Sequence, residues 1–455
     1  MIRICGHKFK FTKYPMAISI FINSLYIFYD KKDYSIFDLE KSYIMPKFFL
    51  ALLLMVTLFD SLSQKNTAPK LGPWRVEMKH FSGILPFNFI VNPSKNQDKF
   101  NIKIQNGSEK FSLGESFFRG DSLVIPFDLY DSEIVAFLTN SKKMNGYWIM
   151  KRDGKAIFRI PLEATSGSTE RYTNLKPSKI NVTGNWMADF WSDENTHSPG
   201  IGMFKQVGNS VTGTFLKPSG DYRFLQGNVS GDSLFMSYFD GSYCMQIRVK
   251  VKGKELSGNF YTGLAGKRNL KATLDPKASL PDLKKLTYLK PGFDRINFSL
   301  PDPDGNTISL QDARFKDKVV VIELMGSWCP NCIDESRFLA PYYKKNKSKG
   351  LEVIGLSFEY SDDMKISGPK IKNFIAKIGI PYPIVLAGKP DDSTIEKVLP
   401  MLHKINGYPT TFIIDKQGKV REIHTGFSGP GTGVYYTDWI QEFDKTIQAL
   451  LIEKP

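Results

Sequence analysis

Between Leu71 and Thr273 apolar and polar residues alternate along the chain, and Gly, Asn, Asp and Ser interrupt the alternation at short intervals. Alternation with a period of two predicts strands with one buried face, and the interruptions predict turns. A helical period is almost absent from this stretch. The sequence therefore predicts an all-β region. Its clearest strand patterns lie at 122–130, 133–140, 233–239 and 244–253.

The β-rich region also resembles itself at a fixed offset. A repeat at a constant spacing indicates two copies of one unit. Each copy is long enough for about eight short strands, so we predict two repeated antiparallel β units, at 68–170 and 178–275, each a small barrel or sandwich. The segments that repeat are GPW at Gly72 and GNW at Gly184, RGDSLVIPF at Arg119 and SGDSLFMSY at Ser230, and NGYW ending at Trp148 and SGNF ending at Phe260.

Few residues in the β units point to chemistry. The tetrapeptide GDSL occurs twice, but a serine nucleophile needs a His and an acid on an α/β scaffold, so we interpret both copies as hairpin turns. Trp74 and Trp186 are predicted core residues rather than a ligand platform. Cys244 is predicted to be a buried, inert thiol, with a relay partner for other cysteines as the alternative. These units fit a docking or dimerising module.

After a predicted linker at 276–289 the pattern changes. Uninterrupted apolar runs at 319–326 and 351–359 are typical of buried parallel strands. Amphipathic segments and a final strand pair surround them, and this order predicts a layered α/β domain over 290–452. The predicted helices lie at 332–346, 368–379, 392–406 and 438–451, and the predicted hairpin strands at 410–415 and 419–426.

The stretch GSWCPNCIDE (326–335) joins the first of these strands to the first helix. Cys329 is thus predicted at a helix N-terminus, where free N–H groups and the helix dipole favour an anion. This placement should lower the thiol pKa from ~8.5 toward 7 or below. Cys332, one turn deeper, would resolve a mixed disulfide. Pro330 suits the first turn because it has no N–H to lose.

Two carboxylates and a proline complete the candidate site. Glu323 lies in the buried strand, so its side chain is predicted beneath the cysteine pair, with a raised pKa and the ability to take the proton of Cys332. Glu335 follows the motif on the next helical turn, where a solvated and a tuned carboxylate are both plausible. Pro409, after Tyr408, begins a strand at a place where a cis peptide bond can hold the backbone against the cysteines.

The W-C-x-x-C motif from Trp328 to Cys332, the strand acid Glu323 and the segment YPTTFIID together resemble the thioredoxin superfamily. The stretch from FSLPDPDG to VVVIE and the insertion at 366–380 are similar to exported TlpA/ResA-type thiol–disulfide oxidoreductases. This resemblance covers about a third of the chain. It implies an α/β thioredoxin fold at the C-terminus and an enzyme that reduces, or sometimes isomerises, disulfides of exported proteins.

The same resemblance implies roles for individual residues. Cys329 matches the nucleophile, Cys332 the resolving thiol, Pro409 the cis-proline and Glu335 the acid that follows the motif in the reductase branch. Glu323 stands where ordinary thioredoxins carry an aspartate. The implied redox group is the Cys329–Cys332 disulfide, with no further cofactor and no metal. The implied partners are disulfide-containing exported proteins and a membrane or periplasmic thiol donor.

Three alternatives remain. A zinc site needs a second Cys/His pair at workable spacing, which five scattered His residues do not supply. A peroxiredoxin shares the start of the domain, and its peroxide-binding signature has a Pro and a Thr before the reactive cysteine. If Cys332 were that cysteine, the corresponding positions would hold Leu324 and Cys329 instead. A non-catalytic binding protein would use the β units and keep the C-terminal domain for stability. The redox hypothesis requires that water reach Cys329.

Composition narrows the choice further. At 455 residues the chain is too long for one core. The formal charge of +15 is spread among many carboxylates and accompanies no nucleic-acid-binding motif, so we predict no nucleic-acid partner. Four cysteines are too few for a disulfide scaffold. Oligomeric state cannot be derived from these numbers.

The segment MPKFFLALLLMVTLFDSLSQ begins at Met45 and has one lysine, an apolar run at 48–59 and small residues after it. This is the layout of a secretory signal peptide, predicted at 45–63, and the run is shorter than the ~20 residues of a membrane span. Residues 1–44 would then be a non-native or accessory leader, with translation starting at Met45. The rivals are an uncleaved anchor and a genuine extension targeted by its own apolar segment from Met16. We predict an exported protein of the bacterial periplasm or cell envelope.

Overall fold

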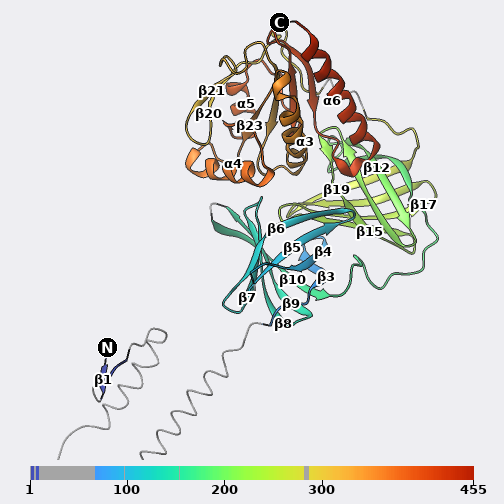
Figure 1. Ribbon diagram of the computed structural model, residues 1–455. Coiled ribbons are helices and arrows are strands. Elements are labelled where there is room, and N and C mark those ends of the chain that lie inside the picture. The colour runs from blue at the N-terminus through green and yellow to red at the C-terminus, as the bar shows by residue number, and fades with distance from the viewer. Residues whose placement is uncertain are drawn as a thin grey trace, which may run out of the picture. The chain divides into compact units, whose positions relative to one another are not determined.

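The structure, a computed structural model, describes residues 2–4, 7–9, 67–96, 98–152, 154–280 and 286–454. It divides into two units, 1–65 and 66–455. In the first unit only strands β1 (Ile2–Ile4) and β2 (His7–Phe9) are described, and they pair antiparallel (Figure 1). The predicted signal peptide at 45–63 lies outside the described residues, as does the rest of the predicted leader.

The first β unit is a closed barrel of eight antiparallel strands in the order β10-β3-β4-β5-β6-β7-β8-β9. The barrel closes where β10 pairs with β3, with Leu162 opposite Met78. Alternate residues of its strands point inward, as the period of two predicted. Its strands are β3 (Gly72–His80), β4 (Gly83–Pro93), β5 (Lys99–Asn106), β6 (Glu109–Arg119), β7 (Ser122–Phe127), β8 (Ser132–Asn140), β9 (Lys143–Arg152) and β10 (Lys155–Ser166).

The second β unit has the same architecture. Eight strands form a ring that β12 and β13 close, with Ile201 opposite Leu216, and the short β14 extends from the end of β13. The predicted pair of repeated antiparallel units is therefore confirmed. The strands are β11 (Gly184–Trp191), β12 (Ser198–Val207), β13 (Ser210–Lys217), β14 (Gly220–Asp221), β15 (Leu225–Ser230), β16 (Ser233–Phe239), β17 (Cys244–Lys252), β18 (Glu255–Thr262) and β19 (Gly266–Leu274).

Two details show that the units repeat at the level of side chains. Trp74 is fully buried and its Nε1 donates to the carbonyl oxygen of Lys70 (2.8 Å), and Trp186 is fully buried and donates to Val182 (2.9 Å). Each tryptophan thus bonds the residue four positions earlier, which confirms the predicted core role. Both GDSL segments are turns that lead into β7 and β16, as predicted.

The core of the first barrel is completed from the second. Phe239 and Cys244, at the turn between β16 and β17, belong to the same buried cluster as the inward residues of the first barrel. Phe239 contacts the ring of Phe87 at 4.3 Å between centroids and that of Trp148 at 5.4 Å. The two barrels therefore pack against each other through a shared apolar cluster.

The C-terminal domain has a five-stranded sheet in the order β24-β23-β22-β25-β26, with β22 and β23 parallel and β25 and β26 antiparallel. This is the thioredoxin-like α/β fold that the sequence predicted. Figure 1 shows helices on both faces of this sheet. The strands are β22 (Val319–Met325), β23 (Leu351–Phe358), β24 (Ile384–Gly388), β25 (Thr410–Ile414) and β26 (Val420–Thr425), preceded by the hairpin of β20 (Ser299–Pro301) and β21 (Thr307–Ser309).

Two predictions about this domain were incomplete or wrong. Strand β24 was not predicted, since its five residues lie between helical patterns. The helix predicted over 392–406 ends at Val398, because Pro400 follows and supplies no N–H for the next turn. None of the described helices combines the length and the apolar character that a membrane span would need. The helices are α3 (Pro330–Asn346), α4 (Met364–Ile378), α5 (Asp392–Val398) and α6 (Val434–Ile452), with short 3-10 turns η2 (Lys347–Lys349) and η3 (Pro430–Thr432).

Candidate active site

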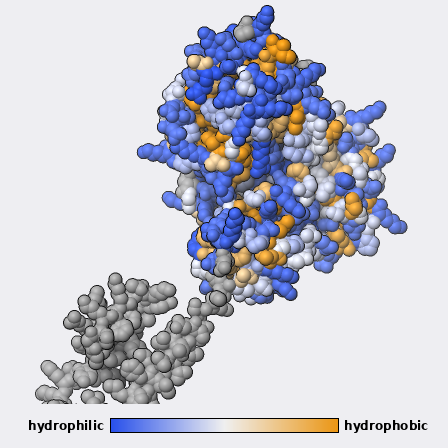
Figure 2. All heavy atoms as spheres, in the orientation of Figure 1, coloured by the Kyte–Doolittle hydropathy of each residue, from blue (hydrophilic) through white to orange (hydrophobic). Residues whose placement is uncertain are grey.

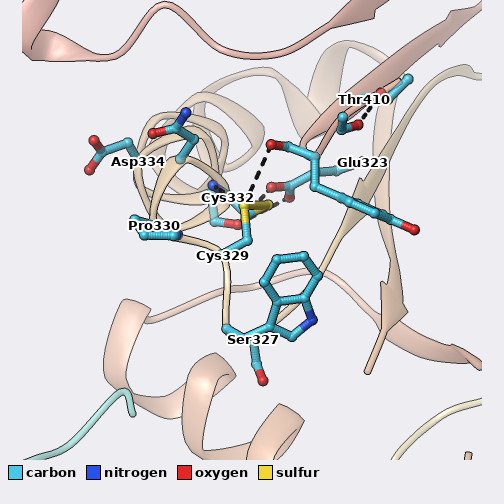
Figure 3. The surroundings of a disulfide bond; sticks show 12 residues. Glu323, Ser327, Cys329, Pro330, Cys332, Asp334 and Thr410 are labelled. Atoms are coloured by element: carbon cyan, nitrogen blue, oxygen red, sulfur yellow. Dashed lines mark hydrogen bonds between the residues drawn. A yellow bond between two sulfur atoms is a disulfide. The ribbon is translucent and has the colours of Figure 1, made fainter. Parts of the chain in front are cut away.

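The two cysteines of the motif lie where the buried strand β22 passes into α3, and they form a disulfide (Figure 3). Cys329 is the N-cap of the helix: its backbone is extended and its Sγ accepts from the N–H of Cys332 at 3.3 Å. Pro330 occupies the first turn, as predicted. A free helix N-terminus therefore points at Cys329, which is the position that favours a thiolate.

The segment before the motif is held by its side chains. Trp328 Nε1 donates to the carbonyl oxygen of Phe358 at 2.9 Å, which ties the motif to the end of β23. The indole lies 5.2 Å from the ring of Tyr360 and 5.6 Å from that of Tyr408, measured between centroids. Trp328 thus packs against Tyr408 of the cis-proline segment and against Tyr360, which follows β23.

The Tyr408–Pro409 peptide bond is cis, as the resemblance implied. The carbonyl oxygen of Tyr408 lies 3.6 Å from Cys329 Sγ. Thr410, the residue after Pro409, begins β25 next to β22. The sheet therefore places the backbone of this segment against the cysteine pair.

Glu323 and Glu335 form a buried acid pair on the inner side of the motif (Figure 3 shows Glu323). Ser336 Oγ donates to the Glu323 carboxylate at 2.9 and 3.1 Å, and Thr411 Oγ1 donates to Glu335 Oε1 at 2.7 Å. Burial raises the pKa of Glu323 well above its ordinary value, and the negative charge of Glu335 raises it further. Burial raises the pKa of Glu335 to about 8.

The position of Glu335 decides between the two interpretations of this residue, a solvated carboxylate and a buried one with a shifted pKa. Its side chain is fully buried, so the solvated reading is wrong. The reason is that Glu335 lies on the face of α3 that packs on the sheet, opposite Thr411 of β25. Its second carboxylate oxygen has no hydrogen-bond partner, which is unusual for a buried polar atom.

The exposure of the nucleophile differs from the expectation. Cys329 is 4% exposed and Cys332 is fully buried, so water reaches Cys329 over only a small part of its surface in this arrangement of the chain. Both sulfur-bearing residues belong to a cluster that includes Ile333 of α3, and Leu129 and Tyr130 of the first barrel pack against it. The β units, which lie outside the motif in sequence, therefore contribute to its burial.

Comparison with known proteins identifies the C-terminal domain. Residues 292–423 match the AhpC/TSA family. The thiol-disulfide oxidoreductase ResA of Bacillus subtilis is 35% identical over 135 residues, which are 30% of this chain and 67% of that protein. ResA of Bacillus anthracis is 32% identical over 131 residues, which are 29% of this chain and 67% of that protein.

The chain belongs to the ResA-like thiol-disulfide oxidoreductases. It is accordingly an enzyme of that class. A solved thiol:disulfide interchange protein from Chlorobium tepidum shares 24% identity over 35% of this chain and 95% of its own, with a TM-score of 0.26, too low to carry an inference. The ResA-like match spans about two thirds of the relatives' length, and both barrels lie outside the matched range 292–423.

Sequence reasoning missed a carboxylate beside the motif of this ResA-like enzyme. Glu359 is buried and accepts from the N–H and the Oγ of Ser327, both at 2.8 Å, and from Ser357 Oγ at 2.6 Å. It fixes the turn that precedes Trp328. The sequence offered one indication of this role: Glu359 is an acidic residue at the end of the apolar run 351–359, as Glu323 is an acidic residue within the apolar run 319–326.

A second feature that the sequence did not predict is a group of charged residues beside the motif, which come from three distant parts of the chain. Arg223, between β14 and β15, donates to the carbonyl oxygen of Pro330 (2.9 Å) and pairs with Asp334 of α3 and Glu109 of β6. All three side chains are at most one tenth exposed. Over a hundred residues separate Arg223 from the motif, so no local pattern could have indicated this contact.

Among the described residues, one cysteine lies outside the ResA-like motif, in the first barrel core. Cys244 is free and lies in the core of the first barrel, where burial raises the pKa of its thiol, in keeping with the predicted inert role. Beside Trp328 opens a cleft of about 740 Å³ between the first barrel and α4, with Tyr130, Met150 and Tyr360 in its walls. In Figure 2 the described surface is mostly polar, with small apolar patches.

Proposed function

We propose that the enzyme reduces disulfides of exported proteins by dithiol–disulfide exchange. The observation that carries this proposal is the position of Cys329 as N-cap of α3, with Cys332 bonded to it and the buried acid pair behind them. The helix N-terminus stabilises a thiolate at Cys329, and the thiolate is the attacking form. The reductase direction is favoured by Glu335, which stands where the reductase branch carries its acid.

In the reduced enzyme the Cys329 thiolate attacks one sulfur of the client disulfide. A new bond joins Cys329 to the client, and the other client sulfur leaves as a thiolate that takes up a proton. Cys332 then loses its proton and attacks Cys329 Sγ, which breaks the mixed disulfide and releases the second client thiol. The client gains two electrons and two protons, and the enzyme is left with the Cys329–Cys332 disulfide. A dithiol donor must reduce that disulfide before the next cycle.

Proton transfer from Cys332 is the step assigned to the buried acids. Cys332 is fully buried, so water cannot serve as its base in this arrangement. Burial raises the pKa of Glu335 to about 8 and that of Glu323 well above its ordinary value, so each group, in its ionised form, is a stronger base toward the Cys332 thiol than an ordinary carboxylate. Glu323 lies on β22 beneath the motif and is the proposed base.

The partners follow from this chemistry. They are disulfide-containing exported proteins on one side and a membrane or periplasmic thiol donor on the other. The apolar run at 48–59, with the layout of a signal peptide, supports export to the bacterial periplasm or cell envelope. We expect neither a metal nor a nucleic acid to take part.

The test uses insulin reduction with a dithiol donor. We expect wild type to reduce insulin, Cys329→Ser to lose the activity, and Cys332→Ser to stop at a mixed disulfide visible by mass spectrometry. Equal rates in wild type and Cys329→Ser would defeat the proposal. Peroxide consumption that survives in Cys329→Ser but not in Cys332→Ser would favour the peroxiredoxin alternative, and no activity in wild type toward either substrate would favour the binding-protein alternative.

A further inference from the structure

A hairpin of the second barrel lies directly on the redox motif. The hairpin comprises the end of β13, the turn at Pro218–Ser219, and β14, with Lys217 opposite Gly220. Asn331, the second residue between the two cysteines, donates from Nδ2 to the carbonyl oxygen of Asp221 at 3.2 Å. Gly220 is so close to this amide that a Cβ at residue 220 would collide with Asn331 Nδ2. The hairpin thus contacts the motif at the dipeptide that separates the cysteines.

The same hairpin also covers the segments on the other side of the motif. A Cβ on Gly407, just before the cis bond, would stand 2.7 Å from Ser219 Cβ, and a Cβ on Gly426 would stand 2.6 Å from the backbone of Gly220 and Ser219. The N–H of Gly426 donates to the carbonyl oxygen of Pro409 at 2.8 Å, so Gly426 belongs to the cis-proline segment. The hairpin therefore touches both halves of the site, and Cys329 between them is 4% exposed.

Buried polar contacts hold the hairpin in this place. Asp221 Oδ2 accepts from the N–H of Gly429 at 2.6 Å, and Asp221 Oδ1 accepts from the N–H of Arg223 at 2.5 Å. Arg223 adds its bond to Pro330 and its ion pairs with Asp334 and Glu109. Its φ of 59° lies in the left-handed region, which a non-glycine residue adopts at a cost. Strain of this kind persists where the surrounding contacts over-determine it.

We propose that hairpin residues 217–223 are a specificity-determining wall of the redox site, which admits disulfides on extended polypeptide segments and excludes folded ones. The wall blocks the flank formed by Asn331, Gly407 and Gly426. We place the client in the cleft of about 740 Å³ beside Trp328, the residue next to Cys329, because the aromatic, apolar and charged side chains of its walls can contact a single extended strand. A folded client must displace the hairpin first. This inference rests on the proposed function.

The first barrel supplies a matched control. Its corresponding hairpin, between β5 and β6, turns at Gly107–Ser108 and lies on the second barrel, where the N–H of Gly107 donates to Gln226 Oε1 at 2.9 Å. Gly107 has a positive φ, as Gly220 does, but a Cβ on Gly107 would meet only ordinary contacts of 3.6 Å or more. Gly107→Ala therefore adds only the cost of a left-handed φ, whereas Gly220→Ala, at a φ of 121°, adds a larger backbone penalty together with the collision with the motif.

The experiment measures access to Cys329 in the reduced full-length enzyme. Alkylation by iodoacetamide and by a maleimide carrying a polyethylene glycol chain is timed from the mass of the peptide that contains Cys329. If the open form is a minor state of ~0.1–10%, displacement of the hairpin raises the rate with the bulky reagent about tenfold or more. We expect this rise, relative to iodoacetamide, in Gly220→Ala and not in Gly107→Ala.

A second variant, Arg223→Lys, loosens the wall without added bulk, because a lysine keeps the charge and cannot make all three contacts of the guanidinium. Wild type should reduce an unfolded, disulfide-bonded peptide faster than insulin, and both variants should narrow that difference. If Gly220→Ala and Arg223→Lys are folded by circular dichroism and alkylate like wild type, the wall is overturned. If wild type alkylates selectively but reduces neither client, the proposed function fails and the wall stands.

Discussion

The two barrels are copies of one eight-stranded unit, and they differ most in what their matching hairpins touch. The β5–β6 hairpin of the first barrel ends on Gln226 of the second barrel, whereas the β13–β14 hairpin of the second barrel ends on the redox motif. The strand framework and the tryptophan contacts are the same in both. The two repeats therefore share the parts that form the core and differ in the contacts of their hairpin tips.

The largest expected effect is on the free energy of unfolding, when a charged residue of each hairpin is replaced in turn. Arg223→Met leaves Glu109 as a buried, unpaired carboxylate and leaves Asp334 with only its 3.6 Å pair to Arg337, which should lower the free energy of unfolding by ~3–5 kcal/mol. Lys99→Met removes a pair with Glu115 whose side chains are 41% and 37% exposed, and should cost at most ~1 kcal/mol. Urea titration of both variants checks this, and similar losses would mean that the hairpins are equivalent.

The next effect concerns pH and the second hairpin alone. Burial raises the pKa of Asp221 from 3.8 to about 6, so between these values the folded protein holds a proton that the unfolded chain releases. The stability contributed by this proton is present below pH ~4 and is lost as the pH rises toward ~6, by at most ~3 kcal/mol.

Asp221→Asn should remove that slope, because the amide does not titrate in this range. Thermal unfolding of the oxidised enzyme at several pH values measures the difference between variant and wild type. Lys110→Met, at the matching exposed position of the first repeat, serves as the control and should leave the slope unchanged. A variant curve parallel to that of wild type contradicts the assignment to Asp221.

The smallest difference is expected at the shared tryptophans. Trp74→Phe and Trp186→Phe each remove the indole donor of a carbonyl oxygen, which belongs to Lys70 in a partly buried hydrogen bond and to Val182 in a buried one. Each should cost ~1–3 kcal/mol, and the two losses should agree within error if the repeats are equivalent inside. A clear inequality in chemical denaturation would show that the two cores have diverged as well as the hairpins.

The features that the sequence predicted correctly depend on local patterns. The alternation of apolar residues and the 111–112 residue offset indicated both barrels, and the order of strand, Trp328 and Cys329 placed the disulfide at a helix start. The cis bond before Pro409 came from the family resemblance rather than from the residues. Each of these features involves residues close together in the chain or in a recurring motif.

The features that could not be predicted depend on packing between distant segments. The burial of Glu335 depends on which face of α3 meets β25, and the covering of Cys329 depends on a hairpin about 110 residues earlier. The early end of α5 had a visible cause in Pro400, but the apolar pattern of 392–406 outweighed it. Strand β24 is short and gains its place from pairing with β23 rather than from its own pattern.

Phe239 and Cys244 of the second unit complete the core of the first barrel, and this matters for the design of truncated fragments. A fragment that stops in the connection between the repeats would leave Phe87, Phe127 and Trp148 facing an empty barrel end, since all three contact Phe239. Such a fragment should aggregate, or bind an apolar side chain of another protein, through this exposed aromatic surface. The two β units are best expressed together, and a domain graft onto another thioredoxin must carry both.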